Sequence, residues 1–343
     1  MSSVPVPPLV SVVLPVYNAE RFVAAALESV LSQSLRAIEL IVLDDGSTDR
    51  SLAEIERVAG ADPRVRIVTR PNKGLIATLN EGVALGRGRW IARMDADDIS
   101  TPDRFAIQLQ HLETSHTDIC GTAVTYFGDG AHPTRVYPLS DAAVKFTLLY
   151  DCALAHPSVM ARASLLKENP YDPAALHAED YELWCRLAMK GATFANVVQP
   201  LLLYRRHGQQ VSLRHRDEQR AHADRAALVY AKWYVVENGL AELAPLVERT
   251  WAGQAPCLRS YAALLWQLEA RRGIPDPHID VHLCASAALR GIGAADAIDI
   301  FRSIRKRAYT GNLDRMKLLV SGLLGRSAYA AIRRANGYLR RAR

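Results

Sequence analysis

The chain has 343 residues, of which 49% are hydrophobic, so one or more domains with a substantial core can form. No apolar run approaches the roughly 20 residues that cross a bilayer, and the five cysteines form no Cys-x-x-Cys pair, which argues against a zinc site or disulfide framework and favours a reducing, cytoplasmic compartment. The net charge of +6 does not indicate a nucleic-acid binder, because residues 302–343 hold twelve Lys or Arg and one acid while the remainder is net acidic.

Strand and helix patterns alternate along the first 115 residues. A Pro-rich stretch over residues 1–8 predicts a flexible arm rather than a signal peptide. Apolar runs and helical spacing then predict strand 10–15, helix 19–32, strand 38–44, helix 51–59, strand 65–69, helix 75–85, strand 90–94 and helix 102–115. This order is typical of a mainly parallel, twisted α/β sheet flanked by helices.

The pattern then becomes irregular, and after residue 210 it becomes purely helical. Strands are predicted at 120–127, 134–137, 158–162, 194–198 and 201–206, and helices at 141–150 and 179–190. Beyond residue 211 the strand signal disappears and Ala, Leu and Arg recur at helical spacing. We therefore expect a catalytic α/β domain over 9–210 and an all-helical C-terminal region with a basic tail over 211–343.

Acidic residues gather where a strand should end or a helix should begin. The three clusters are residues 44–49, residues 95–98 and Glu179-Asp180. Carboxylates at such places are costly unless they face water, a cation or a ligand, and open α/β folds bind ligands at the carboxyl ends of their strands. The dinucleotide fingerprint and the Walker A sequence are absent. The pattern therefore favours a metal–diphosphate site with a catalytic base, built without a glycine-rich phosphate loop.

Residues 10–18 and 41–49 together resemble the opening of family 2 glycosyltransferases of the GT-A fold. The resemblance continues through residues 72–74, Asn80 and residues 91–98, and ends with Glu179-Asp180 and residues 204–207. Asp-x-Asp alone is common by chance, but five elements in this order and at these spacings are specific. The resemblance covers roughly residues 9–213.

The resemblance implies an inverting glycosyltransferase that moves a sugar from a nucleotide-diphosphate donor, a UDP- or dTDP-sugar above all, to a hydroxyl of a glycan or lipid-linked acceptor. It implies a role in surface polysaccharide or glycoconjugate synthesis, with Mg²⁺ or Mn²⁺ as cofactor. Asp97 would ligate the metal, Asp95 would contact the ribose or the metal, and His207 would be a third ligand. The residues expected to bind the donor are Pro15, Tyr17, Asn18, Asp45, Asn72, Gly74, Asn80, Arg93, Asp95, Arg205 and Arg206.

By the same resemblance Asp180 is the general base that takes the proton from the acceptor hydroxyl, and Glu179 assists it. The acids also suit the positive end of a helix dipole, which is a structural interpretation of the same pair. His156 and Trp184 are expected on the acceptor side, with core packing as the alternative for each. Asp98 either joins the metal site or begins the following helix.

Other functions stay open at this level. A nucleotidyltransferase also uses an α/β sheet and aspartates, but it needs a Gly-rich loop where this chain has residues 15–18. A non-catalytic nucleotide-sugar-binding protein and a processive polymerase are further alternatives. Residues 327–341 predict a basic amphipathic helix, which would bind an anionic membrane surface and make the protein peripheral to the inner face of the membrane, or would pack on the helical region.

Overall fold

The computed structural model describes residues 7–208, 216–252 and 258–272. The chain divides into two compact units, residues 1–230 and 231–343, and each is described by itself. The division into a catalytic domain over 9–210 and a helical region over 211–343 stays a prediction. The expected basic helix over 327–341 lies outside the described residues.

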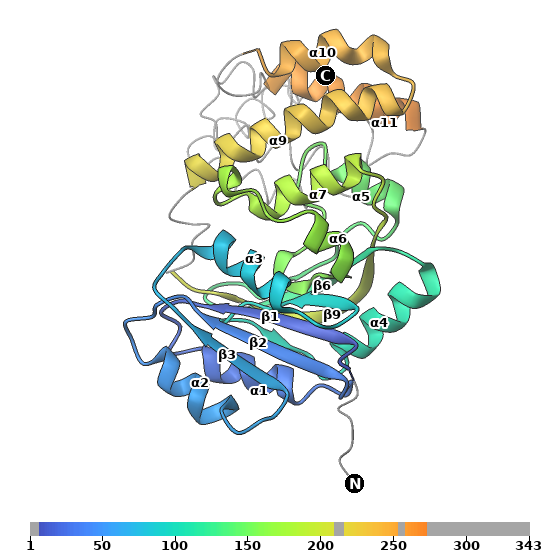
Figure 1. Cartoon of the computed structure of the whole chain (residues 1–343). Helices are drawn as coiled ribbons and strands as arrows, with labels where there is room; N and C mark the ends of the chain where they lie inside the picture. The colour runs from blue at the N-terminus through green and yellow to red at the C-terminus, as the bar shows by residue number, and fades with distance from the viewer. Residues whose placement is uncertain (1–6, 209–215, 253–257, 273–343) are drawn as a thin grey trace, which may run out of the picture. The chain divides into compact units, whose positions relative to one another are not determined.

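A mixed nine-stranded sheet forms the centre of the first unit (Figure 1). Its order is β3-β2-β1-β4-β8-β6-β9-β5, and β7 pairs with β6 outside this path. The strands are β1 (Val10–Val16), β2 (Ile38–Asp44), β3 (Val65–Thr69), β4 (Trp90–Arg93), β5 (Ile99–Ser100), β6 (Ile119–Gly128), β7 (Thr134–Arg135), β8 (Met160–Arg162) and β9 (Phe194–Arg206). The first four strands are parallel, as is the long β6–β9 pair, while β8, β7 and β5 add antiparallel pairings.

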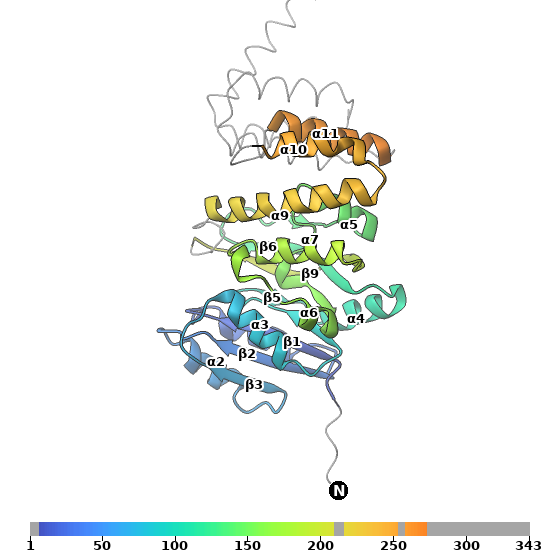
Figure 2. The same ribbon diagram turned by 45° about the horizontal axis from the view of Figure 1, so that its top comes forward.

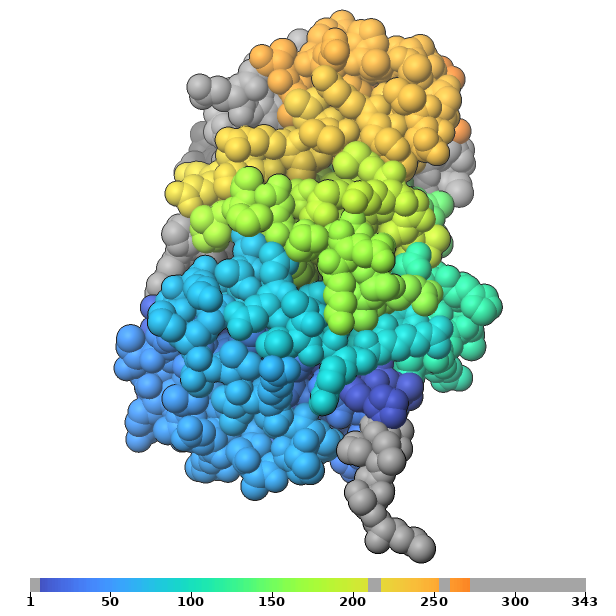
Figure 3. Space-filling model, in the orientation of Figure 1, coloured from blue at the N-terminus to red at the C-terminus, as the bar shows by residue number. Residues whose placement is uncertain are grey.

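Helices cover both faces of the first four strands. On one face the even-numbered residues of β1 pack against α1 and α2 in the main core, and on the other face Gly82 of α3 lies so close to Val13 that a methyl group there would clash. Helix α6 lies next to α3 in both ribbon views (Figures 1 and 2). In the space-filling view the yellow-green segment lies directly against the cyan surface (Figure 3). The helices of this part are α1 (Val23–Leu31), α2 (Ser51–Ala59), α3 (Leu75–Leu85), α4 (Arg104–Ser115), α5 (Asp141–Thr147), α6 (Ala163–Glu168) and α7 (Glu179–Met189), with 3-10 turns η1 (His156–Ser158) and η2 (Pro173–Ala175).

The described residues beyond 216 form helices and no strand, as the composition predicts. They are α9 (Arg216–Glu237), η3 (Ala241–Leu243), α10 (Ala244–Thr250) and α11 (Leu258–Arg272). In the second unit Leu264, Leu265 and Leu268 of α11 are buried, and so is Val247 of α10. Among the described helices, none has both the length and the apolar character that a membrane span requires.

The α/β fold class is confirmed, and several boundaries are corrected. The two strands predicted at 194–198 and 201–206 are one strand, β9, which continues across an irregularity in its pairing with β6. Helix α1 begins at Val23 rather than at residue 19, because Asn18 takes a left-handed conformation with φ of 50° and residues 17–22 form a loop. The short elements β5 and α6 were not predicted, since two and six residues give too little periodicity.

Candidate active site

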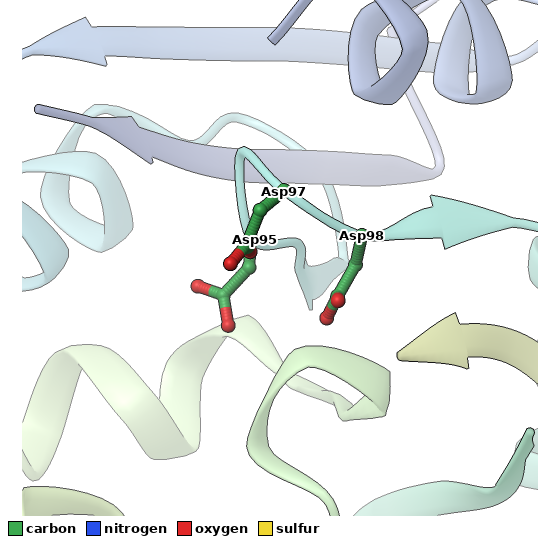
Figure 4. A group of neighbouring side chains, drawn as sticks. All are labelled: Asp95, Asp97 and Asp98. Atoms are coloured by element: carbon green, nitrogen blue, oxygen red, sulfur yellow. The ribbon is translucent and has the colours of Figure 1, made fainter. Parts of the chain in front are cut away.

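Three aspartates lie together in the loop that joins β4 to β5. Figure 4 shows the side chains of Asp95, Asp97 and Asp98 leaving this acid loop toward the same region, and one carboxylate oxygen from each lies within 4.8 Å of the other two. The loop follows β4, so the carboxylates lie at the carboxyl edge of the parallel strands, as predicted. Such a group of hard oxygen atoms suits Mg²⁺ or Mn²⁺.

The acid loop carries negative charge that the folded chain does not fully balance. Asp98 is only 1% exposed, and its buried Oδ2 has no hydrogen-bond partner among the described residues. Burial raises the pKa of Asp98 well above its usual range, and the charges of Asp95 and Asp97 raise it further. Burial likewise raises the pKa of Asp95, against the opposing effect of Arg93. An unpartnered buried oxygen beside two more carboxylates is the donor set that a divalent cation would complete.

The end of β9 is fastened to this loop. The main-chain N–H of Arg205 donates to Asp98 Oδ1 at 2.8 Å, and Arg205 Nε donates to the carbonyl oxygen of Asp97 at 2.7 Å. His207 Nε2 lies 2.9 Å from Asp97 Oδ2. Strand β5, which follows the loop directly, pairs with β9 through Ile99 and Leu203. The fold thus brings His207 to Asp97 across 110 positions of sequence, and the shared metal-ligand role that the resemblance implies for them stays a prediction.

Two buried arginines lie beside the acid loop. Arg93 forms an ion pair with Asp95, and its buried Nε has no hydrogen-bond partner among the described residues. Arg104 is fully buried and donates to the carbonyl oxygen of Arg93 at 2.8 Å and to Ser100 Oγ at 3.0 Å. Burial lowers the pKa of Arg104 to about 9, although Asp98 opposes the shift. Sequence reasoning did not find Arg104, since nothing in its local pattern distinguishes it from a surface arginine in the first turn of a helix.

Glu179 and Asp180 begin α7 and carry perturbed carboxyl groups. Asp180 Oδ1 accepts from the N–H of Tyr181 at 2.7 Å, and its Oδ2 lies 3.7 Å from the thiol of Cys152, which donates to it. Burial raises the pKa of Asp180. Burial and the charge of Asp180 together raise the pKa of Glu179 to about 7. Asp180 also contributes to the raised pKa of Asp95, so the second and third acidic clusters act on each other electrostatically.

The first acidic cluster is arranged differently, around the ends of β1 and β2. Asp45 forms an ion pair with Arg70, and it also accepts from the N–H groups of Lys73 and Gly74 at 2.8 and 2.9 Å. The left-handed Gly46 permits this turn, since a Cβ there would lie 2.7 Å from the nitrogen of Asn72. Asp45, Asn72 and Gly74 are therefore brought together, but sequence reasoning missed Arg70, whose only signal is its place at the end of β3.

Residues at the end of β1 and in the loop that follows it lie beside the turn that holds Asp45. Asn18 Oδ1 accepts from the N–H of Thr48 at 2.8 Å, and the N–H of Asn18 donates to Ser47 Oγ at 3.0 Å. Tyr17 is 54% exposed and Pro15 is half-buried. The loop is thus tied to the turn that holds Asp45, with the ring of Tyr17 turned to solvent.

Three predicted site residues have mainly structural contacts. The side chain of Asn80 bonds both the N–H and the carbonyl oxygen of Tyr171, at 2.8 and 2.9 Å. His156 Nε2 lies 2.9 Å from Tyr171 Oη, and burial, with Arg93, lowers the pKa of His156 well below its usual value. Trp184 has no exposed surface and packs edge-on against His156. Its geometry is that of a core residue, which is the alternative the sequence left open.

Comparison with known proteins indicates the same family that the sequence motifs resemble. A family model described as glycosyl transferase family 2 matches residues 11–168. A Bacillus subtilis protein named putative glycosyltransferase EpsE is 33% identical over 201 residues, which are 57% of this chain and 72% of that protein.

Solved structures share the fold at low identity. TarS 1–349 from S. aureus, in complex with UDP, has a TM-score of 0.56 at 16% identity and covers 88% of this chain and 92% of its own. The mannosyltransferase PcManGT from Pyrobaculum calidifontis, in complex with GDP-Man and Mn²⁺, has a TM-score of 0.54 at 14% identity and covers 95% of this chain and 87% of its own. The architecture is therefore the GT-A fold that the sequence predicted.

Proposed function

Because this chain belongs to glycosyltransferase family 2, we propose that it transfers a sugar from a nucleotide-diphosphate donor to a hydroxyl group, with inversion at the anomeric carbon. The observation that carries the proposal is that an incompletely satisfied acid loop contacts His207 and lies within electrostatic reach of Asp180. A UDP- or dTDP-sugar is the favoured donor, and a glycan or lipid-linked molecule is the favoured acceptor. TarS with UDP and PcManGT with GDP-Man are solved relatives of the fold that support a nucleotide donor.

The residues present fit a divalent cation. Asp97, Asp95 and His207 would hold Mg²⁺ or Mn²⁺, with the buried Asp98 supporting the site by its charge. When bound, the cation supplies positive charge that neutralises the donor diphosphate and the departing nucleotide. The Mn²⁺ in the PcManGT structure supports this assignment.

The donor lies, in this proposal, across the ends of β1, β2 and β4. Asp45 accepts from the imide N–H of a uracil or thymine ring; its Oδ2 accepts one internal hydrogen bond and keeps a second lone pair for the base. Pro15, Tyr17, Asn18, Asn72 and Gly74 form the surrounding pocket. The cations assigned to the diphosphate are Arg93, Arg205 and Arg206.

The acceptor side is assigned to the start of α7. Asp180 takes the proton from the acceptor hydroxyl as its oxygen attacks the anomeric carbon, and the bond to the diphosphate breaks on the opposite face. The N–H of Tyr181 and the thiol of Cys152 hold the carboxylate of Asp180 in place. Glu179, with a pKa of about 7, can keep its proton at neutral pH and donate a hydrogen bond to the acceptor. No second nucleophilic carboxylate is needed in a single displacement.

A donor screen with two variants tests the proposal. UDP-, dTDP- and GDP-sugars are offered with Mn²⁺, and thermal stabilisation and donor hydrolysis are measured. We expect one donor to stabilise the protein and to be hydrolysed, with both effects lost in excess chelator and in Asp97→Ala. Full activity in chelator contradicts the metal assignment. Donor binding without turnover on any acceptor would favour a non-catalytic nucleotide-sugar-binding protein instead.

A further inference from the structure

The ring of Phe22 contacts Arg205 and His207, which lie at the end of β9 beside the acid loop. Phe22 ends the loop after β1 and immediately precedes α1. Its ring centroid lies 4.9 Å from that of His207, and the guanidinium carbon of Arg205 lies 4.7 Å from the same centroid. One side chain from the nucleotide side of the site therefore touches both residues at the end of β9.

Arg205 is held between two aromatic rings. The guanidinium carbon that lies over Phe22 also lies 4.3 Å from the ring centroid of Phe127 in β6. Its Nε donates to the carbonyl oxygen of Asp97, and its main-chain N–H donates to Asp98 Oδ1. Both rings contact the guanidinium, and its Nε hydrogen bond holds one edge at Asp97, so Arg205 joins the acid loop to Phe22. Cation–π contacts of this kind are worth roughly 0.5–2 kcal/mol each.

His207 depends on this arrangement in a second way. Its bond to Asp97 joins two groups that we assign to the same cation, and that bond is lost when both turn to a metal. The contact with Phe22 is between the two rings, which are tilted by 35° to each other, and it is not a hydrogen bond to Nε2. A bond from Nε2 to a metal does not require that this ring contact be broken.

We propose that Phe22 is a positioning residue, which holds Arg205 and His207 against the acid loop and so couples the nucleotide-side loop to the metal site. The inference rests on the proposed function. It assigns a role to a residue that touches neither reacting atoms nor metal, and it predicts that the ring, rather than its apolar volume, is what matters.

Metal binding without turnover tests the role of the ring. Mn²⁺ affinity is measured by titration calorimetry, first with Mn²⁺ alone and then with UDP present, for the wild type, Phe22→Leu and Phe22→Tyr. Phe22→Leu keeps an apolar side chain of similar size and loses the ring, so we expect Mn²⁺ binding to weaken roughly 3- to 10-fold. Phe22→Tyr keeps both ring faces and should bind Mn²⁺ like the wild type.

Two further variants separate this role from simple packing. Arg21→Ala removes another guanidinium near the ring, 5.3 Å from its centroid, and should leave Mn²⁺ affinity unchanged, since Arg21 is exposed and has no hydrogen bond or ion pair with the acid loop in the described part of the chain. In a His207→Ala background, Phe22→Leu should have a smaller effect than it has alone, because part of its action passes through His207.

The outcomes distinguish a failure of the proposed function from a failure of the role assigned to Phe22. A wild-type protein that binds neither Mn²⁺ nor UDP contradicts the proposed function itself. A wild type that binds Mn²⁺ together with a Phe22→Leu variant of equal affinity overturns only the role of Phe22. Weak binding by Phe22→Tyr, equal to that of Phe22→Leu, would also overturn it, because the ring would then not be the cause.

Discussion

Asp45 and Asp98 are both buried at the same edge of the sheet, yet their carboxylates are satisfied in opposite ways. Asp45 is 4% exposed and is held by Arg70 and by the N–H groups of Lys73 and Gly74. Asp98 is 1% exposed and has an oxygen with no hydrogen-bond partner among the described residues. The first carboxylate is neutralised by the chain itself, while the second leaves charge for something outside the chain to neutralise.

This difference separates the carboxylate that we assign to nucleobase recognition from the carboxylates that we assign to metal binding and catalysis. A carboxylate that is fixed by internal donors keeps its shape whether a ligand is present or not, which suits reading a nucleobase. A cluster of under-satisfied carboxylates costs stability in the free protein, and the cost is offset when a cation binds. Asp95, Asp98 and Glu179 belong to this second kind, and burial raises the pKa of each carboxyl group.

The largest effect is expected at Asp180, the buried carboxylate that we assign as the general base. Asp180→Asn keeps the shape of the side chain and removes its basicity, so kcat should fall roughly 10²-fold or more while UDP binding persists. Glu182→Gln, two residues along α7 and paired with Arg186, is the matched control. Sugar transfer at the normal rate by Asp180→Asn would show that another group is the base.

Removing the counter-charge at the first site should cost stability instead. Arg70→Met leaves the buried Asp45 without its ion-pair partner, and we expect a loss of about 3 kcal/mol in the free energy of unfolding. Arg57→Met breaks an exposed pair, with the Arg57 side chain 59% exposed, and should cost less than about 1 kcal/mol. Urea denaturation measures both. Equal stability of the two variants would mean that Asp45 is neutralised by the backbone alone.

Glu179 predicts a pH dependence of stability. Its pKa is raised to about 7 from the usual 4.5, so the folded chain binds this proton more tightly than the unfolded chain does. Stability is therefore lost as the pH rises from about 4.5 to about 7, by up to about 3 kcal/mol. Glu179→Gln should be more stable than the wild type at pH 8 and similar at pH 4.5, in thermal melts, whereas the exposed Glu113→Gln should show no such difference. A Glu179→Gln gain that is the same at both pH values would contradict the raised pKa.

The smallest expected change in stability is at Asp98, and it has the opposite sign to the change expected at Arg70. Asp98→Asn replaces a carboxyl group whose charged form burial disfavours and keeps the acceptor for the N–H of Arg205, so the metal-free protein should gain about 1 kcal/mol of stability at a pH where that carboxyl is ionised. The same variant should bind Mn²⁺ more weakly. A destabilised Asp98→Asn would place Asp98 with Asp45, among carboxylates that the chain already satisfies.

Local sequence patterns predicted the strands and the acidic residues of the site but not the residues that hold them in place. The apolar runs before Asp44 and Asp95 located the strands correctly, because a buried parallel strand is a continuous apolar segment. The resemblance implied that His207 and Asp97 bind one metal ion, and the structure places their side chains 2.9 Å apart. Their role as metal ligands stays a prediction.

Arg70, Arg104, Tyr171 and Phe22 could not be predicted in the same way. Each acts through a partner that is distant in sequence or that local periodicity does not identify: Arg104 donates to the carbonyl oxygen of Arg93, and Tyr171 lies beside His156. Such partners are chosen by the packing of elements against each other, and one arginine or aromatic residue carries no periodicity to reveal it. The two strands expected at 194–198 and 201–206 failed for a similar reason, since the bulge between them looks like a turn in sequence.

That bulge has a consequence for how the chain tolerates insertions and deletions. Strand β9 uses 13 residues where its partner β6 uses 10, with the shifts in register near Ala123. Three is an odd number, and side chains alternate between faces at every residue, so the bulge decides which face Arg205 occupies. The exposed residues 198–200 should accept almost any substitution. Deleting one of them changes the parity of the strand and would turn its end away from the acid loop, so their number is constrained although their identity is not.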